Sequence, residues 1–145
     1  MDLAGTNNGT LLGGYVEIGD GAFVSGNVLI HQFVRIGRLA MLSGGCGIGK
    51  DVPPFCTTIG IQRNSVGGLN TIGMRRAGLS TAERAQVKKA FGLLYRSNLN
   101  VSQALDRMRQ EFVDGPAMEL VEFVAASRRG ICPMHGSAEE EGVDI

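Results

Sequence analysis

The chain has 145 residues with 14 basic and 14 acidic side chains, and therefore carries no formal net charge at pH 7. This length is typical of one domain or a small pair of subdomains. No apolar run approaches the roughly 20 residues that a membrane-spanning helix needs, and nothing resembles a secretory signal. These features argue against a membrane-spanning or secreted class, and we predict a cytoplasmic protein without a transmembrane segment.

The N-terminal half repeats with a period of six. An aliphatic residue recurs at every sixth position for seven turns, and a small or β-branched residue follows each of them four positions later. The first set is Leu12, Ile18, Val24, Ile30, Ile36, Leu42 and Ile48, and the second set is Val16, Ala22, Val28, Val34, Ala40, Cys46 and Val52. This interval is typical of a parallel β-helix, in which each six-residue unit forms one short strand and one corner. A β-sandwich would instead show a period of two.

A change in composition after about residue 73 predicts a helical region, so that the fold class is β plus α. We expect the β-helix and a connecting loop over residues 1–73, three helices over 74–129 and a disordered tail over 130–145. Ser80 and Glu83 have the form of a capping box, Asn100 can cap a second helix, and Pro116 can start a third. Each predicted helix has an apolar stripe that we interpret as core: Val87, Phe91, Leu94 and Tyr95; Val101, Ala104, Leu105, Met108 and Phe112; and Ala117, Leu120, Val121 and Val124.

Charge follows the same division. Residues 71–129 carry ten basic and six acidic side chains, whereas residues 1–70 carry four of each. This excess is either a solvated helix surface or a means of attracting an acidic partner by long-range steering; we expect no nucleic-acid partner.

The cysteines indicate neither a disulfide framework nor a metal site. Their number, three, is odd, which argues against a disulfide framework and favours a reducing cytoplasm. Cys132 and His135 form a lone C-x-x-H in a polar tail, and we predict no metal site and no cofactor.

The predicted β-helix is too short to be stable alone. Seven hexads make only two and a third turns of a three-faced coil, which bury little surface. We therefore predict a homo-oligomer whose monomer does not fold independently. A homotrimer suits a three-faced prism packed about an axis.

Several short motifs carry a family resemblance. They are His31-Gln32-Phe33, Gly44-Gly45-Cys46, Asp51-Val52-Pro53-Pro54-Phe55, Gly68-Leu69-Asn70, Arg75-Arg76-Ala77-Gly78-Leu79-Ser80 and Leu93-Leu94-Tyr95-Arg96-Ser97. In this order they resemble the C-terminal half of the UDP-N-acetylglucosamine 3-O-acyltransferases of lipid A biosynthesis. The resemblance covers roughly residues 10 to 129.

The resemblance implies a homotrimer of left-handed β-helices with active sites between neighbouring subunits. There, a 3-hydroxyacyl group would pass from the thioester of acyl carrier protein to the glucosamine 3-hydroxyl of UDP-N-acetylglucosamine. This chemistry needs a general base for the hydroxyl group and a donor for the oxyanion of the tetrahedral intermediate.

The resemblance also assigns roles to particular residues. Gly14 would supply the N–H of the oxyanion hole. His31 and Gln32 match contacts to the sugar nucleotide, Asn70 and Arg76 match residues near its uridine and phosphates, and Met41 and Gly44 match the end of the acyl chain. An arginine can hold phosphate oxygens in two-pronged hydrogen bonds. For each residue a structural role is the alternative: a coil-surface residue for His31, core filling for Met41 and a helix-flanking charge for Arg76.

The chain also departs from the family pattern. The family's catalytic histidine would lie in a coil that precedes Met1, Tyr15 stands in place of a second histidine, and Ile72 replaces an acidic substrate contact. Loss of a general base costs a factor of about 10²–10⁴ in rate. Three hypotheses follow: a truncated relative of the acyltransferase, a non-catalytic trimeric module that binds a nucleotide sugar, an acyl group or a partner protein, and an acyltransferase that uses His31 of a neighbouring subunit as base.

Overall fold

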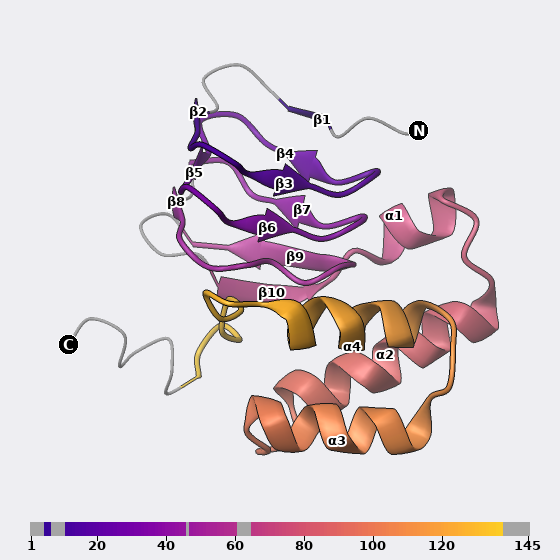
Figure 1. Cartoon of the computed structure of the whole chain (residues 1–145). Helices are drawn as coiled ribbons and strands as arrows, with labels where there is room; N and C mark the ends of the chain where they lie inside the picture. Colours follow the sequence, from indigo (N-terminus) through magenta and orange to yellow (C-terminus); the bar gives the residue numbers. More distant parts are fainter. Residues whose placement is uncertain (1–4, 7–10, 46, 61–64, 138–145) are drawn as a thin grey trace.

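Short strands, parallel except for β10, form three sheets in the N-terminal half of the computed structural model, which describes residues 5–6, 11–45, 47–60 and 65–137 (Figure 1). The layers of these strands, from β1 to β10, are called the stack. The β4 sheet contains β1 (Gly5–Thr6), β4 (Phe23–Val24), β7 (Met41–Leu42), β9 (Cys56–Ile59) and β10 (Ser65–Leu69). The β5 sheet contains β2 (Leu11–Leu12), β5 (Leu29–Ile30) and β8 (Gly47–Ile48), and the β6 sheet contains β3 (Glu17–Ile18) and β6 (Arg35–Ile36). From β1 to β9, successive strands therefore belong to different sheets.

The hexad period explains this arrangement. Glu17 of β3 pairs with Arg35 of β6, which lies 18 residues later in the chain. The same interval and parallel register relate four other strand pairs: β1 and β4, β2 and β5, β4 and β7, and β5 and β8. Three hexads therefore make one layer of the stack, with a corner between each strand and the next. The prediction of parallel strands followed by helices is confirmed.

The second residue of each strand and the small residue after the corner make the core. Most of both predicted sets are fully buried: Ala22, Val24, Val28, Ile30, Val34, Ile36, Ala40, Leu42, Ile48 and Val52. Leu12 is 50% exposed, and Val16 and Ile18 are partly buried. Among the described strands β2 and β3 each have a neighbour on one side only, which explains this exposure. Cys46 lies outside the described residues.

Three elements that follow the last hexad were not expected. β9 and β10 form an antiparallel hairpin that continues the β4 sheet and contains an irregularity between Val66 and Gly68. A short helix, α1 (Thr71–Arg76), then leaves the stack and crosses the predicted boundary at residue 73. These elements have no six-residue period, so the pattern that identified the stack could not predict them.

The three predicted helices are confirmed. They are α2 (Thr81–Tyr95), α3 (Val101–Glu111) and α4 (Pro116–Ala126). Ser80 and Asn100 each form a complete capping box, with Glu83 and Gln103 respectively. The backbone N–H and the hydroxyl group of Ser80 hydrogen-bond with Glu83 and lower the pKa of its carboxyl group. Most of the predicted stripes are buried between the helices, although Val101 is exposed.

The helices lie against one end of the stack (Figure 1). Phe91 of α2 joins the buried cluster of the stack, together with Cys132 from the far end of the chain. Phe91 and Cys132 thus cover the last layer of the core, which contains Ile48 and Val52.

The C-terminal segment, defined here as residues 127–137, also packs on the stack. Ile131 forms a bridge with Asp51 and Met134 forms one with Val66. Cys132 is buried, and its carbonyl accepts a hydrogen bond from the Tyr95 hydroxyl group at 2.7 Å. The prediction of a disordered tail is therefore wrong for residues 130–137, because backbone pairing with the stack orders a segment of low apolar content. Residues 138–145 lie outside the described residues.

Candidate functional site

One corner of the stack brings three predicted site residues together. Residues 31–33 connect β5 to β6, and a Cβ atom added to Gly14 would lie 3.7 Å from Nε2 of Gln32. The Phe33 N–H donates to the carbonyl of Gly14 at 3.1 Å. A Cβ atom on Gly13 would lie only 2.5 Å from the Gln32 nitrogen, so this close stacking requires glycine. Gly14, His31 and Gln32 therefore form one group, which we call the His31 corner.

The functional groups of the His31 corner are free to bind a ligand. His31 and Gln32 are both exposed. In the part of the chain that the structure describes, neither their side chains nor the Gly14 N–H makes a hydrogen bond within the protein. The corner thus presents a backbone donor, an imidazole and an amide, which can donate to or accept from a polar ligand.

An aromatic pair borders the same corner. Tyr15 and Phe33 stack with ring centroids 5.6 Å apart and planes 7° from parallel, although both side chains are exposed. They line a cavity of about 720 Å³ with Arg128 and Arg129 of the C-terminal segment. Sequence reasoning missed this pair, although the signal was present: Tyr15 and Phe33 are 18 residues apart and so occupy equivalent positions in adjacent layers.

Met41 and Gly44 lie on a different part of the stack. Met41 is the first residue of β7 and its side chain is partly exposed on the β4 sheet. Gly44 lies in the corner between β7 and β8, where an added Cβ atom would come within 3.2 Å of the Gly26 carbonyl oxygen. A larger residue at position 44 would press on the backbone of the adjacent layer.

Asn70 and Arg76 are at a third place, the two ends of α1. The Asn70 amide donates to the carbonyl of Leu39 at 2.8 Å, and its oxygen accepts from the Gly73 N–H at 3.0 Å. Asn70 thereby caps α1 and fixes it to the corner between β6 and β7. Arg76 is exposed, and among the described residues it has no hydrogen-bonding or ionic partner.

The seven predicted site residues therefore occupy three separate places on the chain. The His31 corner lies between the β5 and β6 sheets, α1 is attached between the β6 and β4 sheets, and Gly44 lies between the β4 and β5 sheets. The topology places these corners apart around the stack. One copy of the chain does not assemble them into a single site.

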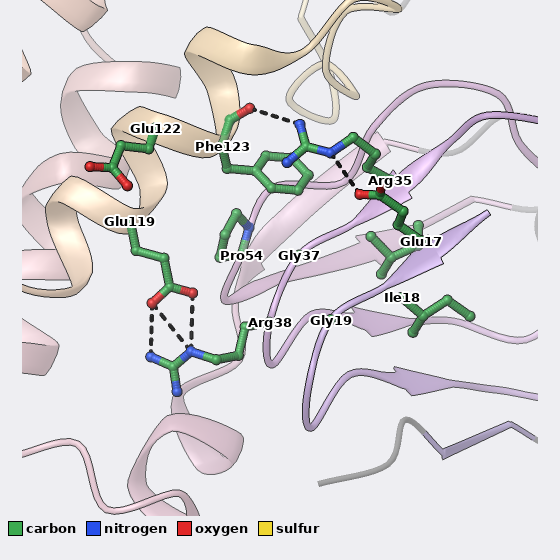
Figure 2. A pocket seen from close by; sticks show the side chains of 11 residues that line it. Glu17, Ile18, Gly19, Arg35, Gly37, Arg38, Pro54, Glu119, Glu122 and Phe123 are labelled. Carbon is green, nitrogen blue, oxygen red and sulfur yellow. Dashed lines mark hydrogen bonds and ion pairs between the residues drawn. The ribbon is translucent and has the colours of Figure 1, made fainter. Parts of the chain in front are cut away.

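A smaller cavity, of about 410 Å³, lies where helix α4 contacts the β6 sheet (Figure 2). Arg38 makes a two-pronged ion pair with Glu119, which raises the pKa of the Arg38 guanidinium. Arg35 donates to Glu17 and to the Phe123 carbonyl, and its guanidinium lies 4.3 Å from the centre of the Phe123 ring. Because these groups are paired with one another, we interpret the cavity as a helix–sheet joint.

A basic groove runs along α2. Its cavity of about 600 Å³ has Arg84, Lys88 and Arg96 on its walls and Phe91 among its apolar lining. The predicted excess of positive charge in the helical region is thus partly gathered on one surface. Such a groove suits an acidic partner with an apolar part.

The described residues contain no metal centre and no membrane helix. Within them, no three His, Cys, Asp or Glu side chains come together as a metal site would require. Cys56 and Cys132 are both buried, and burial raises the pKa of the Cys56 thiol. None of the helices in these ranges is both long and apolar enough to cross a bilayer.

Comparison with protein families and curated proteins gives one consistent match. The family described as UDP N-acetylglucosamine O-acyltransferase, domain 2, matches residues 51–132. An acyl-[acyl-carrier-protein]–UDP-N-acetylglucosamine O-acyltransferase from Gloeothece citriformis is 43% identical over 131 residues, which cover 87% of this chain and 47% of that protein. The enzyme of the same name from Anaeromyxobacter dehalogenans is 38% identical over 125 residues, covering 86% and 48%.

Solved structures give the same match. UDP-N-acetylglucosamine acyltransferase from Francisella novicida aligns with a TM-score of 0.83 at 33% identity, over 91% of this chain and 49% of that one. The one from Campylobacter jejuni aligns with a TM-score of 0.80 at 30% identity, over 91% and 50%. The chain spans about half the length of the curated relatives and structures that it matches.

Proposed function

Because the chain belongs to the UDP-N-acetylglucosamine O-acyltransferase family, whose C-terminal half it matches, we propose that it contributes the sugar-nucleotide side of an acyl-transfer site. The names of its relatives support UDP-N-acetylglucosamine as acceptor and acyl carrier protein as donor of the acyl group. The observation that carries the proposal is the His31 corner, where Gly14, His31 and Gln32 leave their polar groups unpaired among the described residues.

The proposed reaction is acyl transfer from a thioester to a hydroxyl group. The glucosamine 3-hydroxyl oxygen attacks the thioester carbonyl, the C–S bond breaks, an ester C–O bond forms, and the carrier thiol leaves with a proton. In this proposal the Gly14 N–H donates to the oxyanion of the tetrahedral intermediate, a contribution that enzymes use to lower this barrier. His31 and Gln32 bind the sugar nucleotide.

The proposed reaction also needs a general base for the 3-hydroxyl group. The family resemblance implies a histidine in this role, and the 145 residues contain two histidines, His31 and His135. His135 lies in the C-terminal segment, where its ring approaches the Ser65 hydroxyl group at 3.3 Å, away from the His31 corner. His135 is therefore not proposed as the base.

The proposed architecture is a left-handed parallel β-helix that assembles as a cytoplasmic homotrimer. The 18-residue pairing interval and the similarity to the solved acyltransferases support the β-helix. Exposed apolar side chains on the β4 and β5 sheets, namely Phe23, Met41 and Leu29, support burial against other copies. A trimer would also bring corners of neighbouring subunits together, so that Asn70 and Arg76 of one could face the His31 corner of the next, and Met41 and Gly44 could border the acyl chain.

The basic groove on α2 supports the proposed donor. A carrier protein with acidic surface groups would be steered towards Arg84, Lys88 and Arg96, and this attraction would weaken as salt screens it. We propose this groove as the contact for acyl carrier protein.

Calorimetric titration with UDP-N-acetylglucosamine tests the proposed site. We expect the parent chain to bind the nucleotide and Arg76→Ala to bind at least about tenfold more weakly, because a hydrogen bond to a charged group contributes about 1.5–3 kcal/mol. Arg75→Ala is the matched control, since Arg75 is also exposed on α1. Absence of binding by the parent would contradict the proposal and would favour the alternative, a non-catalytic trimeric module with an assembly role.

A further inference from the structure

Arg129 of the C-terminal segment reaches the His31 corner from far along the chain. Its Nη1 donates to the carbonyl of Gln32 at 3.1 Å, and its Nε donates to the carbonyl of Gly49 at 3.0 Å. Gln32 and Gly49 lie in corners of adjacent layers, because a Cβ atom on Gly49 would lie 3.8 Å from Cδ2 of His31. The guanidinium therefore bridges two layers of the stack at the place where the proposed nucleotide contacts lie.

Few other interactions hold the residues of the His31 corner in place. Within the described ranges the His31 and Gln32 side chains make no hydrogen bond, so their directions follow the local backbone. That backbone is held by the His31 N–H on the Ile48 carbonyl at 2.9 Å and the Phe33 N–H on the Gly14 carbonyl. Of the side chains that the structure describes, only that of Arg129 hydrogen-bonds to the backbone of residues 31–33.

Arg129 is itself held on both sides. Before it, the Ser127 hydroxyl group donates to Oδ2 of Asp51 at 2.6 Å, and after it the Gly130 carbonyl accepts from the Asp51 N–H at 3.0 Å. Asp51 is 1% exposed, and its other carboxylate oxygen accepts from the Arg35 N–H. The buried aspartate thus fixes the segment that carries Arg129. A donor held in place in this way loses little conformational freedom when it binds its two carbonyls.

We propose that Arg129 is a positioning residue for the sugar-nucleotide contacts, acting through the backbone of the His31 corner. This inference rests on the proposed function of that corner. It links the end of the helical region to ligand binding on the stack, and it assigns the arginine no contact with the ligand itself.

The first test measures UDP-N-acetylglucosamine binding by calorimetry. We expect Arg129→Gln to bind about tenfold more weakly than the parent chain. Arg129→Lys should recover part of the loss, because an ammonium group can donate to one of the carbonyls but lacks the planar fork that serves both. Arg128→Gln is the matched control: Arg128 has the same charge, is exposed, and makes no hydrogen bond among the described residues. It should remain within about twofold of the parent.

The second test separates positioning from a merely structural role. The chain has two histidines, so its imidazole NMR signals come from His31 and His135 alone. Without ligand, Arg129→Gln should shift or broaden the His31 signal and leave that of His135 in place, whereas Arg128→Gln should move neither. Movement of both signals would indicate a general loosening of the C-terminal segment and would contradict the proposal. An unmoved His31 signal with unchanged affinity would overturn it.

The two proposals can fail separately. If the parent chain does not bind UDP-N-acetylglucosamine, the proposed function fails, and the His31 signal of the ligand-free protein alone decides whether Arg129 positions the corner. If the parent binds and Arg129→Gln binds equally well, the proposed function stands and the role of Arg129 is rejected.

Discussion

The stack and the helical region are stabilised in different ways. In the stack, each layer contributes a few aliphatic residues, and adjacent corners approach so closely that backbone touches backbone. In the helical region, apolar stripes from three helices interdigitate, and caps hold the helix starts. The stack therefore depends on the fit of its backbone, whereas the helices depend on the volume of their side chains. The candidate site lies on the stack, and part of its support comes from the end of the helical region.

The largest effect is expected where the two regions meet. Phe91 is 3% exposed and packs into the core of the stack from α2. Phe91→Ala should lower the free energy of unfolding by about 4 kcal/mol, because truncation of a buried phenylalanine removes apolar contacts and leaves a cavity. Urea unfolding at a fixed chain concentration measures this effect, since the proposed association would also contribute to stability. Val113→Ala, at a side chain that is 92% exposed, is the control and should change stability by less than about 0.5 kcal/mol.

A smaller effect on stability is expected from alanine substitution at Gly37, and it should differ from that at Gly49, which occupies an equivalent hexad position. A Cβ atom on Gly37 would lie 2.3 Å from the Pro54 nitrogen, whereas one on Gly49 meets only the edge of His31 at 3.8 Å. Gly37→Ala should cost about 2–3 kcal/mol through forced movement of the backbone, and Gly49→Ala should be nearly neutral. Equal urea midpoints for the two variants would show that the layers of the stack can move apart to accept the added methyl group. That result would contradict the claim that the stack depends on the fit of its backbone.

The same contrast explains which parts of the fold the sequence could predict. Strands of the stack and helix starts are encoded locally, by the hexad at Ile30 and Ile36 and by the caps at Ser80 and Asn100. The β9–β10 hairpin and the ordered segment around Cys132 depend on backbone pairing with residues far away in the chain. Such pairing leaves no periodic signal, and low apolar content was therefore mistaken for disorder.

The candidate site, like the fold, could be predicted only in part from the sequence. Motif positions identified Gly14, His31 and Gln32, and the structure brings these three together. No spacing could indicate that Arg129 binds the carbonyls of this corner, because the contact spans 97 residues. The roles of the site residues stay predictions. For Asn70, the hydrogen bonds to Leu39 and Gly73 identify a structural task that the motif alone did not suggest.

Within the helical region, loss of a cap should have a moderate effect that depends on pH. Ser80→Ala removes the hydrogen bond from the Glu83 N–H to the Ser80 hydroxyl group and should cost about 1 kcal/mol at pH 7. Hydrogen bonds from the backbone and side chain of Ser80 lower the pKa of Glu83, so the folded chain keeps this carboxylate charged to a lower pH than the unfolded chain does. Its contribution is present above the unfolded pKa of about 4.3 and is lost as the pH falls through the lower folded value.

Thermal unfolding at pH 7 and pH 3 checks this dependence. The variant keeps the backbone N–H of residue 80 but lacks the hydroxyl group, so it has less of this contribution to lose. The stability gap between parent and variant should narrow on acidification. A gap that is constant with pH would show that the hydroxyl group acts only as a neutral cap.

The smallest effect is expected at the ion pair that joins α4 to the β6 sheet. Arg38 and Glu119 form three short contacts of 3.0–3.2 Å, but both side chains are 36% exposed. A double-mutant cycle with Arg38→Gln and Glu119→Gln should therefore give a coupling energy of only about 0.5–1 kcal/mol, and less in high salt. Arg35 and Glu17 make a single contact, and Glu17 is more exposed than Glu119. A double-mutant cycle with this pair should therefore give a smaller coupling energy. Coupling above about 2 kcal/mol at Arg38 would mean that this joint, rather than the apolar contact of Phe91, holds the helices on the stack.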